Sequence, residues 1–90
     1  MGDSIFAGLL STARMEIVAL FGKNVRRLRG AKNLSQEELS YRCDMKRSYL
    51  SDLERGARNP SIRALGRLAD ALGVDPSLLL TEDFELPDNY

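Results

Sequence analysis

Residues that start and stop helices recur at short intervals along this 90-residue chain, and they limit what it can fold into. The stretch NLSQEEL places Ser35 three residues before Glu38, the spacing of a capping box that starts a helix. Gly56 and Gly73 follow apolar helical patterns at places where a helix ends, and Ser61 is a good N-cap. No run alternates apolar and polar residues as a strand does. We therefore expect an all-α fold, a compact bundle of about five short helices.

Apolar spacing between these signals gives the expected boundaries of the helices. Helices are predicted over residues 16–32, from Gln36 to about Cys43, and around Leu50 and Leu53. The first two of the three are separated by the capping box, and the last two by about three residues, which makes a helix-turn-helix unit. A fourth helix after Ser61 should turn these residues inward: Ile62, Leu65, Leu68, Ala69 and Leu72. The fifth, SLLL, should follow Asp75 and Pro76.

The two ends of the chain differ from the domain expected over residues 16–80. Residues 1–15 form an N-terminal extension with Met15 as an alternative start, and helical spacing predicts an extra short helix, packed on the core or on a second subunit, from Ile5, Phe6, Leu9, Leu10 and Ala13. Residues 81–90, TEDFELPDNY, form an acidic tail with four acids and no base. Between Lys23 and Gly73 there are 12 basic and 6 acidic residues, so the formal net charge of +0 is the sum of a basic body and an acidic tail.

Several kinds of chemistry are excluded by the residues that the chain lacks. With no His and a single Cys43, it cannot build a Cys/His zinc site or an internal disulfide, and Cys43 is expected to be a small buried apolar residue. There is no glycine-rich phosphate loop and no nucleophile with a base nearby in sequence, so we expect neither an enzyme nor a metal or cofactor. No apolar run has the length of a membrane span, and the first residues do not resemble a signal peptide. These features predict a cytoplasmic protein.

The helix around Leu50 carries the most informative pattern. On a helical wheel the side opposite Leu50 and Leu53 holds, within an arc of about 140°, these polar residues: Arg47, Ser48, Ser51, Asp52 and Arg55. An arginine can donate two hydrogen bonds to guanine, a serine allows close approach, and an aspartate can accept from cytosine. A merely solvated amphipathic helix has the same wheel, so the wheel alone leaves both interpretations open.

The surroundings of this helix favour DNA. Gln36 stands at the start of the preceding helix, the end that meets the phosphate backbone in helix-turn-helix proteins. Arg55, Arg58 and Asn59 follow the helix, where they could bind phosphates without reading sequence. The alternative for Arg55 and Arg58 is simple exposure to solvent.

The series LSQEEL, YLSDLERG, NPS and LADALGV resembles the phage Cro/repressor-type (XRE-like) helix-turn-helix domain over about residues 18–80. The part MKRSYLSDLERGARNPS is especially similar to the controller proteins of restriction-modification systems. The resemblance implies a dimeric transcriptional regulator that reads a palindromic operator, such as that of a restriction-modification operon, with its third helix in the major groove. No small-molecule effector is expected.

By position, the resemblance implies base contacts from Arg47, Ser48, Ser51 and Asp52. Backbone contacts are implied for Gln36, Lys46, Arg58 and Asn59, with Tyr49 at the edge of the groove. Arg29 and Glu54 match a pair that forms an internal salt bridge.

Two residues of the turn depart from the family pattern. Asp44 stands where the family prefers Gly, and Lys46 stands where a Ser or Thr cap is usual. Either Asp44 caps the next helix from further back, or the start of that helix is less rigid.

A dimer is needed because one helix-turn-helix unit reads few base pairs, and half-sites lie about 34 Å apart. The last helix and the tail offer the apolar residues expected at its interface: Val74, Leu78, Leu80, Phe84 and Leu86. The remaining acidic tail is expected to be solvated and to point away from DNA. An alternative function is an antitoxin-like module that binds a partner protein as well as DNA.

Overall fold

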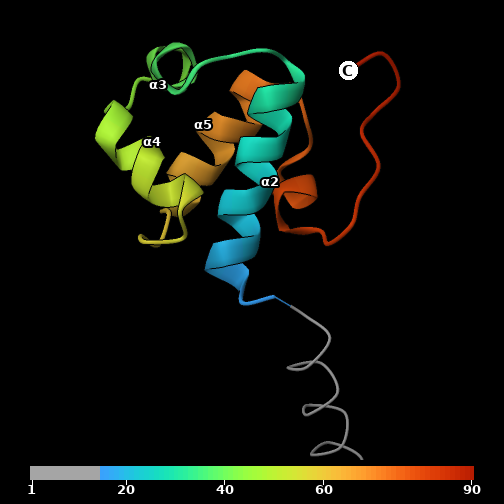
Figure 1. Ribbon diagram of the computed structural model, residues 1–90, viewed down its shortest axis with the longest axis horizontal. Helices are drawn as coiled ribbons and strands as arrows, with labels where there is room; N and C mark the ends of the chain where they lie inside the picture. The colour runs from blue at the N-terminus through green and yellow to red at the C-terminus, as the bar shows by residue number, and fades with distance from the viewer. Residues whose placement is uncertain (1–14) are drawn as a thin grey trace, which may run out of the picture.

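The structure, a computed structural model, describes residues 15–90, and this part is all-helical. Its elements are α2 (Ile17–Ala31), α3 (Gln36–Cys43), α4 (Arg47–Glu54), α5 (Ile62–Leu72) and the 3-10 helix η1 (Pro76–Leu80). They surround α2, with α3 and α4 on one side and η1 on the other (Figure 1). The all-α prediction is confirmed, and the fifth predicted helix is a 3-10 helix. The additional helix expected within residues 1–14 lies outside the described residues.

Side-chain caps begin four of these five elements. The hydroxyl of Ser61 accepts a hydrogen bond from the Ala64 N–H at the start of α5, and the Asp75 carboxylate accepts from the Ser77 N–H at the start of η1. At the start of α2 the Glu16 carboxylate accepts from two backbone N–H groups. These bonds satisfy donors that a helix cannot pair internally. The exception is α4, which is described below with the turn that precedes it.

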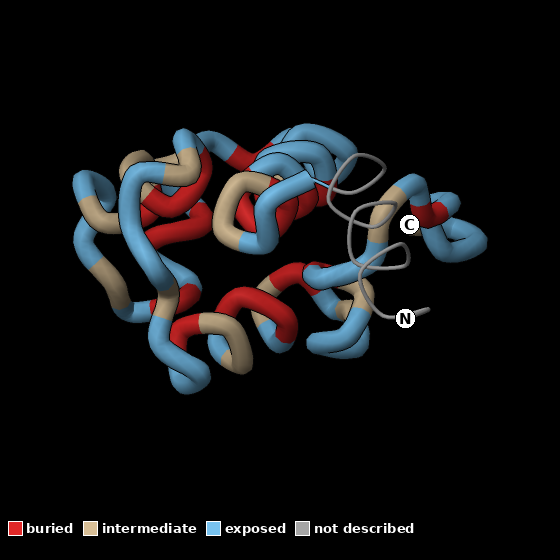
Figure 2. Tube along the Cα trace, turned by 90° about the horizontal axis from the view of Figure 1, so that it is seen from below, coloured by how far each residue is buried: buried red, intermediate tan, exposed pale blue. Residues whose placement is uncertain are grey.

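The core lies where α2, α3, α4, α5 and η1 meet, and in Figure 2 the buried stretches face a common centre. It is formed by Phe21, Val25, Leu28, Leu39, Cys43, Leu50, Leu53, Leu68, Leu72 and Leu79, among others. Ile62 does not belong to it, because its side chain is 83% exposed. The prediction for Ile62 was wrong since this residue is the first of α5 and lies at the rim of the core, where one face of the helix has no neighbour.

Gly22 lets α2 and α4 approach each other closely. A Cβ at this position would lie 2.2 Å from the carbonyl oxygen of Leu53 and 2.9 Å from that of Glu54. Only a residue without a side chain fits against this backbone. The glycine that weakens α2 by about 1 kcal/mol in propensity is therefore required for the packing of α4.

The acidic tail packs on the body, which corrects the expectation that it is solvated. Phe84 is only 8% exposed and belongs to the core, and Arg27 both donates to the Phe84 carbonyl oxygen at 2.7 Å and lies over its ring at 4.5 Å. Tyr90 donates to the Leu72 carbonyl oxygen at 2.8 Å, with the Lys32 ammonium 4.3 Å from its ring centre. The apolar and aromatic residues of the tail outweigh its acids, and Asp83, Glu85 and Asp88 stay exposed to water while the chain between them is held.

Asn24 fixes the segment from which the tail leaves. Its amide donates to the carbonyl oxygens of Leu79 at 2.9 Å and Thr81 at 3.0 Å, although its own side chain is buried on α2. The tail then runs along the side of α2 that is remote from α4 (Figure 1). The acids of the tail are thus kept apart from the surface that carries α3 and α4.

Candidate nucleic-acid interface

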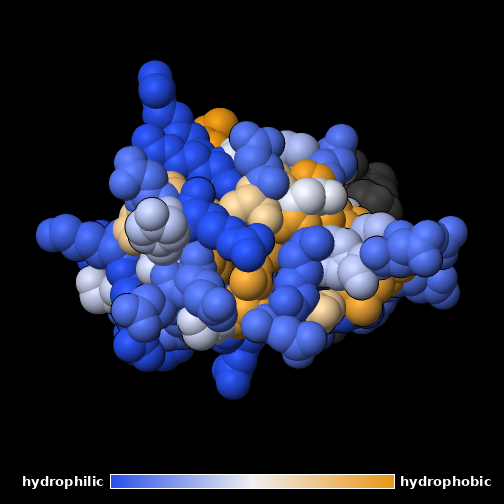
Figure 3. Space-filling view, turned by 90° about the horizontal axis from the view of Figure 1, so that it is seen from above, coloured by the Kyte–Doolittle hydropathy of each residue, from blue (hydrophilic) through white to orange (hydrophobic). Residues whose placement is uncertain are grey.

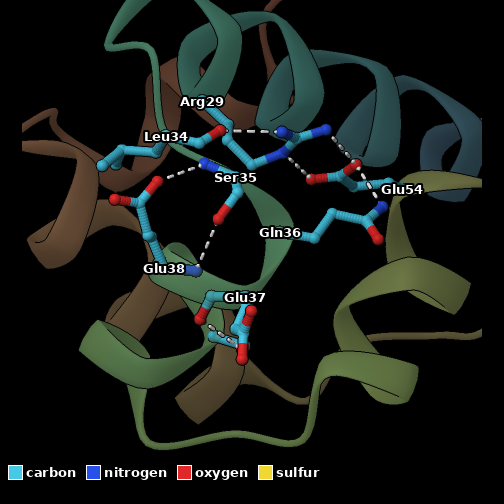
Figure 4. Close-up of polar contacts among 8 residues, drawn as sticks. Arg29, Leu34, Ser35, Gln36, Glu37, Glu38 and Glu54 are labelled. Atoms are coloured by element: carbon cyan, nitrogen blue, oxygen red, sulfur yellow. Dashed lines mark hydrogen bonds and ion pairs between the residues drawn. The ribbon is translucent and has the colours of Figure 1, made fainter.

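The first helix of the helix-turn-helix unit begins with the predicted capping box. The Ser35 hydroxyl accepts from the Glu38 N–H at 3.0 Å, and the Glu38 carboxylate accepts from the Ser35 N–H at 2.8 Å (Figure 4). The Ser35 backbone N–H, followed by the Ser35 hydroxyl, lowers the pKa of the Glu38 carboxyl. The N-terminus of α3 is therefore held in a defined direction, and it carries the positive end of the helix dipole.

The turn between α3 and α4 settles the two departures from the family pattern. Asp44 has φ 54°, in the left-handed region, and ends α3 in the way a glycine would. Lys46 is the N-cap of α4, and this cap has no side-chain hydrogen bond. Asp44 does not cap α4 from further back, so α4 starts without a side-chain cap.

An ion pair and two further hydrogen bonds fix the other end of α4. Arg29 donates from Nε to Oε2 of Glu54 at 2.6 Å and from Nη2 to Oε1 at 3.0 Å. Its Nη1 also donates to the Leu34 carbonyl oxygen at 2.8 Å, just before α3 (Figure 4). Because the Glu54 side chain is only 2% exposed, the pair is shielded from water. The expected pair of Arg29 and Glu54 is present and links α2, the α3 entry and α4.

Gln36 takes part in the same network, which the sequence did not predict. Its Nε2 donates to Oε1 of Glu54 at 2.9 Å, so α3 and α4 are joined directly (Figure 4). Gln36 was expected to contact a phosphate, and this hydrogen bond occupies part of its amide. Spacing along the chain gave no sign of the contact, because the two residues are 18 positions apart.

The outer face of α4 presents the predicted base-reading residues. Leu50 and Leu53 are fully buried, whereas Arg47 and Ser48 are exposed and Ser51 is half-buried. Among the described residues Arg47 makes no ion pair, so its guanidinium faces solvent. The face therefore offers a free arginine and two small hydroxyls on a helix that is held from behind.

Asp52 is in a different situation from the other three. Arg55 donates from Nη2 to Oδ1 of Asp52, and Nη2 of Arg58 lies 3.6 Å from Oδ2. The guanidinium of Arg58 also lies 5.2 Å from the ring centre of Tyr49. The structure thus brings Asp52, Arg55, Arg58 and Tyr49 together as one group, and both oxygens of the carboxylate predicted to meet a cytosine face arginines instead.

The side of the molecule that carries α3 and α4 is covered mainly by hydrophilic residues, and apolar surface lies toward its middle and the tail (Figure 3). Two of the other predicted backbone residues are exposed: Lys46 just before α4 and Asn59 in the loop after it. Within residues 15–90 no group of three or more His, Cys, Asp and Glu residues could hold a metal ion. No helix of this part is long and apolar enough to cross a membrane.

The predicted dimer residues are divided by the structure. Leu80 and Leu86 are 42% and 40% exposed, Val74 and Leu78 are half-buried against the core, and Phe84 is buried in its own chain. Phe84 is therefore corrected to a core residue. An apolar cleft that the sequence did not predict lies nearby, lined by Ile17, Val18, Phe21, Asn59, Pro60, Ser61, Ile62, Leu65 and Leu80.

A family model described as a helix-turn-helix domain matches residues 20–81 of this chain. The chain belongs to the helix-turn-helix family. Among curated relatives, the control protein C.BamHI of Bacillus amyloliquefaciens is 50% identical over 62 residues, which are 68% of this chain and 76% of that protein.

Two solved structures of helix-turn-helix proteins give the same result for the fold. The restriction-modification controller protein C.AhdI of Aeromonas hydrophila superposes with a TM-score of 0.67 and 44% identity, over 69% of this chain and 94% of that one. The controller protein C.Esp1396I, solved as a tetramer on its natural 35 base-pair operator, superposes with a TM-score of 0.66 and 26% identity, over 73% and 87%.

Proposed function

We propose that this helix-turn-helix protein is a dimeric transcriptional regulator that reads a palindromic DNA operator in the major groove. The observation that carries the proposal is the arrangement of α4, which exposes Arg47 and Ser48 while Glu54 and two buried leucines hold it against α2 and α3. A helix that is fixed from behind can place side chains on base edges with a defined register. The likeness to C.AhdI and to operator-bound C.Esp1396I supports a restriction-modification operon as the target. Such a regulator would act in the cytoplasm.

Direct readout would come from the outer face of α4. Arg47 can donate two hydrogen bonds to O6 and N7 of a guanine, and Ser48 and Ser51 are short enough to lie against the floor of the groove. Phosphate contacts would come from the ends of the unit, that is from the exposed residues Lys46, Arg55, Arg58 and Asn59, together with Tyr49 and the free part of the Gln36 amide. These contacts set register and carry no sequence information themselves.

A second copy of the chain would cover the apolar cleft. Ile17, Ile62 and Leu80 are 51%, 83% and 42% exposed around it, which is more apolar surface than an isolated domain usually leaves in one place. Asn59 and Pro60 line the same cleft and belong to the loop after α4. A two-fold contact there would bring the two loops together and place both α4 helices on one side of the dimer, as two half-sites require. Leu78, Val74 and Leu86 do not line the cleft and remain predicted interface residues.

Selection of bound duplexes from a random DNA pool tests the proposed function. We expect an enriched palindrome whose half-sites lie about one helical turn apart. On that operator, Arg47→Ala should abolish discrimination between the operator and altered half-sites, whereas Arg58→Ala should lower the affinity and the salt dependence without changing which bases of the half-site are preferred. If no sequence is enriched, or if the two variants lose affinity equally on every duplex, α4 does not read bases.

Sedimentation equilibrium tests the dimer surface. Ile62→Asp places a charge in the middle of the cleft and should give a monomer with an unchanged helical content. Tyr41→Asp is the matched control, because Tyr41 is 88% exposed on α3 and does not line the cleft. A dimer that persists in Ile62→Asp would place the interface elsewhere.

A further inference from the structure

Asp52 contributes a negative charge to the surface that should meet DNA. Its side chain is 29% exposed on α4, between the free Arg47 at the start of the helix and the two arginines that follow its end. Arg55 and Arg58 are 64% and 55% exposed, so both could reach a phosphate, yet in the structure both face the Asp52 carboxylate. Tyr49 supports this arrangement from the side of Arg58.

Asp52, Arg55 and Arg58 together have the net charge of a single cation, because the Asp52 carboxylate offsets one of the two arginines. A phosphate that recruits Arg55 or Arg58 has to draw it from Asp52, and the carboxylate then remains beside the DNA. Exposed ion pairs contribute little to folding, so the stability of the pairs themselves does not explain the group. Against a polyanion the same charge matters more, because each phosphate contact adds to affinity in proportion to the counterions that it releases.

The position of Asp52 makes this repulsion depend on the base sequence. An unpaired carboxylate that is desolvated against the groove is unfavourable. In the major groove only cytosine N4 and adenine N6 offer hydrogen-bond donors to it. A base pair that places such a donor near Asp52 gives the carboxylate a new hydrogen bond in place of its contacts with the arginines. A base pair that places an acceptor there leaves the carboxylate unpaired.

We propose that Asp52 is a specificity-determining residue that weakens binding to DNA in general. It keeps Arg55 and Arg58 paired in the free protein and releases them at low cost only on a sequence that offers a donor to its carboxylate. This inference rests on the proposed function. It also revises the role of Asp52 from a contact that adds affinity for one base to one that chiefly lowers affinity for the others.

The salt dependence of binding to a random duplex and to the selected operator tests the proposal. Asp52→Asn and Asp52→Ala both release the arginines, and each should steepen the log–log salt slope on random DNA by about 0.9, the value of one added phosphate contact. That slope corresponds to roughly eightfold tighter binding for each tenfold dilution of salt. On the operator the gain should be smaller, so the ratio of the operator affinity to the random-duplex affinity should fall. Asp70→Asn, which removes an exposed acid on α5 outside this group, should change neither slope beyond a general charge effect.

A second background separates release of the arginines from a structural effect. In Arg55→Gln/Arg58→Gln, removal of the Asp52 charge should no longer steepen the slope, because no guanidinium remains to be released. Weaker binding of Asp52→Asn to both duplexes, or an unchanged slope on random DNA, would overturn the proposal. If the wild-type protein itself selects no sequence, the proposed function has failed. This result comes from the wild type alone and is therefore distinct from the results with the Asp52 variants.

Discussion

Arg29 on α2 and Glu54 at the end of α4 form a two-point ion pair, with Nε–Oε2 at 2.6 Å and Nη2–Oε1 at 3.0 Å. The carboxylate has a third partner in Gln36 on α3. One buried side chain therefore joins the central helix to both helices of the helix-turn-helix unit. The direction of α4, on which base reading would depend, is set by a contact that has no part in the reading itself.

Arg29→Met should be strongly destabilising because it leaves the Glu54 carboxylate buried and without its charged partner. We expect a loss of about 3 kcal/mol in the free energy of unfolding, measured by urea denaturation. The double variant Arg29→Met/Glu54→Leu should recover most of the loss, since a packed apolar pair can replace a buried ion pair. Arg26→Met, an exposed arginine of the same helix, is the control and should cost little. Equal stability of the Arg29 and Arg26 variants would show that the pair is not shielded.

Gly22→Ala should also be destabilising, although alanine is the better helix former by about 1 kcal/mol. The new Cβ would lie 2.2 Å from a backbone oxygen of α4, so the helices must separate, and we expect a net loss of about 2 kcal/mol. Gly66→Ala in α5 is the matched control, because a Cβ there meets nothing within 4 Å. The midpoint temperature of thermal unfolding should fall for Gly22→Ala and rise for Gly66→Ala. A stabilised Gly22→Ala protein would mean that α2 and α4 are not in close contact.

Local signals determined most of the fold. The capping box at Ser35, the glycine after α4 and the N-cap at Ser61 act within one helical turn, and the helices begin and end where these residues predict. The inner faces followed from apolar spacing, except at Ile62, where the pattern continues past the edge of the core. Asp44, which stands where the family prefers Gly, adopts the left-handed backbone that this turn requires.

Contacts between distant residues could not be read from such signals. Gln36 and Asn24 find partners 18 and 55 to 57 positions away, and nothing in their neighbourhood along the chain indicates this. The tail was judged by its charges, whereas Phe84 and Tyr90 decide its position by burial and hydrogen bonding. At the candidate site the outer face of α4 followed from the wheel, but the pairing of Asp52 with Arg58 depends on the shape of the loop that follows.

Lys46→Ser should stabilise the protein and weaken DNA binding at the same time. The N-cap of α4 lacks a side-chain acceptor, and a serine would supply one for about 1 kcal/mol of stability. The same change removes an ammonium from the edge of the DNA-binding surface, so the salt slope should become shallower by about 0.9. Lys46→Gln, which removes the charge without adding a good cap, should show the loss of affinity alone. A Lys46→Ser protein that binds DNA as well as the wild type would exclude Lys46 from the phosphate contacts.

Phe84→Ala should destabilise the whole domain, because the tail closes the core beside α2. Removal of a buried phenylalanine ring is expected to cost about 3 kcal/mol, together with the contact of Arg27 with the ring. Leu86→Ala is the control within the same tail, since Leu86 is 40% exposed, and its effect should stay within about 0.5 kcal/mol. Similar, small effects of both substitutions in a urea titration would contradict the packing of the tail and would indicate that it is solvated, as its charges suggest.

Cys43 should be almost unreactive in the folded protein. It is 3% exposed, its Sγ lies 3.8 Å from the Arg67 carbonyl oxygen, and burial raises the pKa of its thiol to about 11. At pH 8 the folded protein then holds roughly one thiolate in a thousand molecules, against about one in four for a free cysteine of pKa about 8.5. A chromogenic disulfide reagent, whose reaction with the thiol is followed by absorbance, should modify the native protein slowly and the urea-unfolded protein at once. Because the folded pKa is the higher one, the neutral thiol favours the folded state, and this contribution is present below about pH 8.5 and is lost as the pH rises toward 11. Fast modification of the native protein at pH 8 would mean that α3 opens away from α5 far more often than their packing allows.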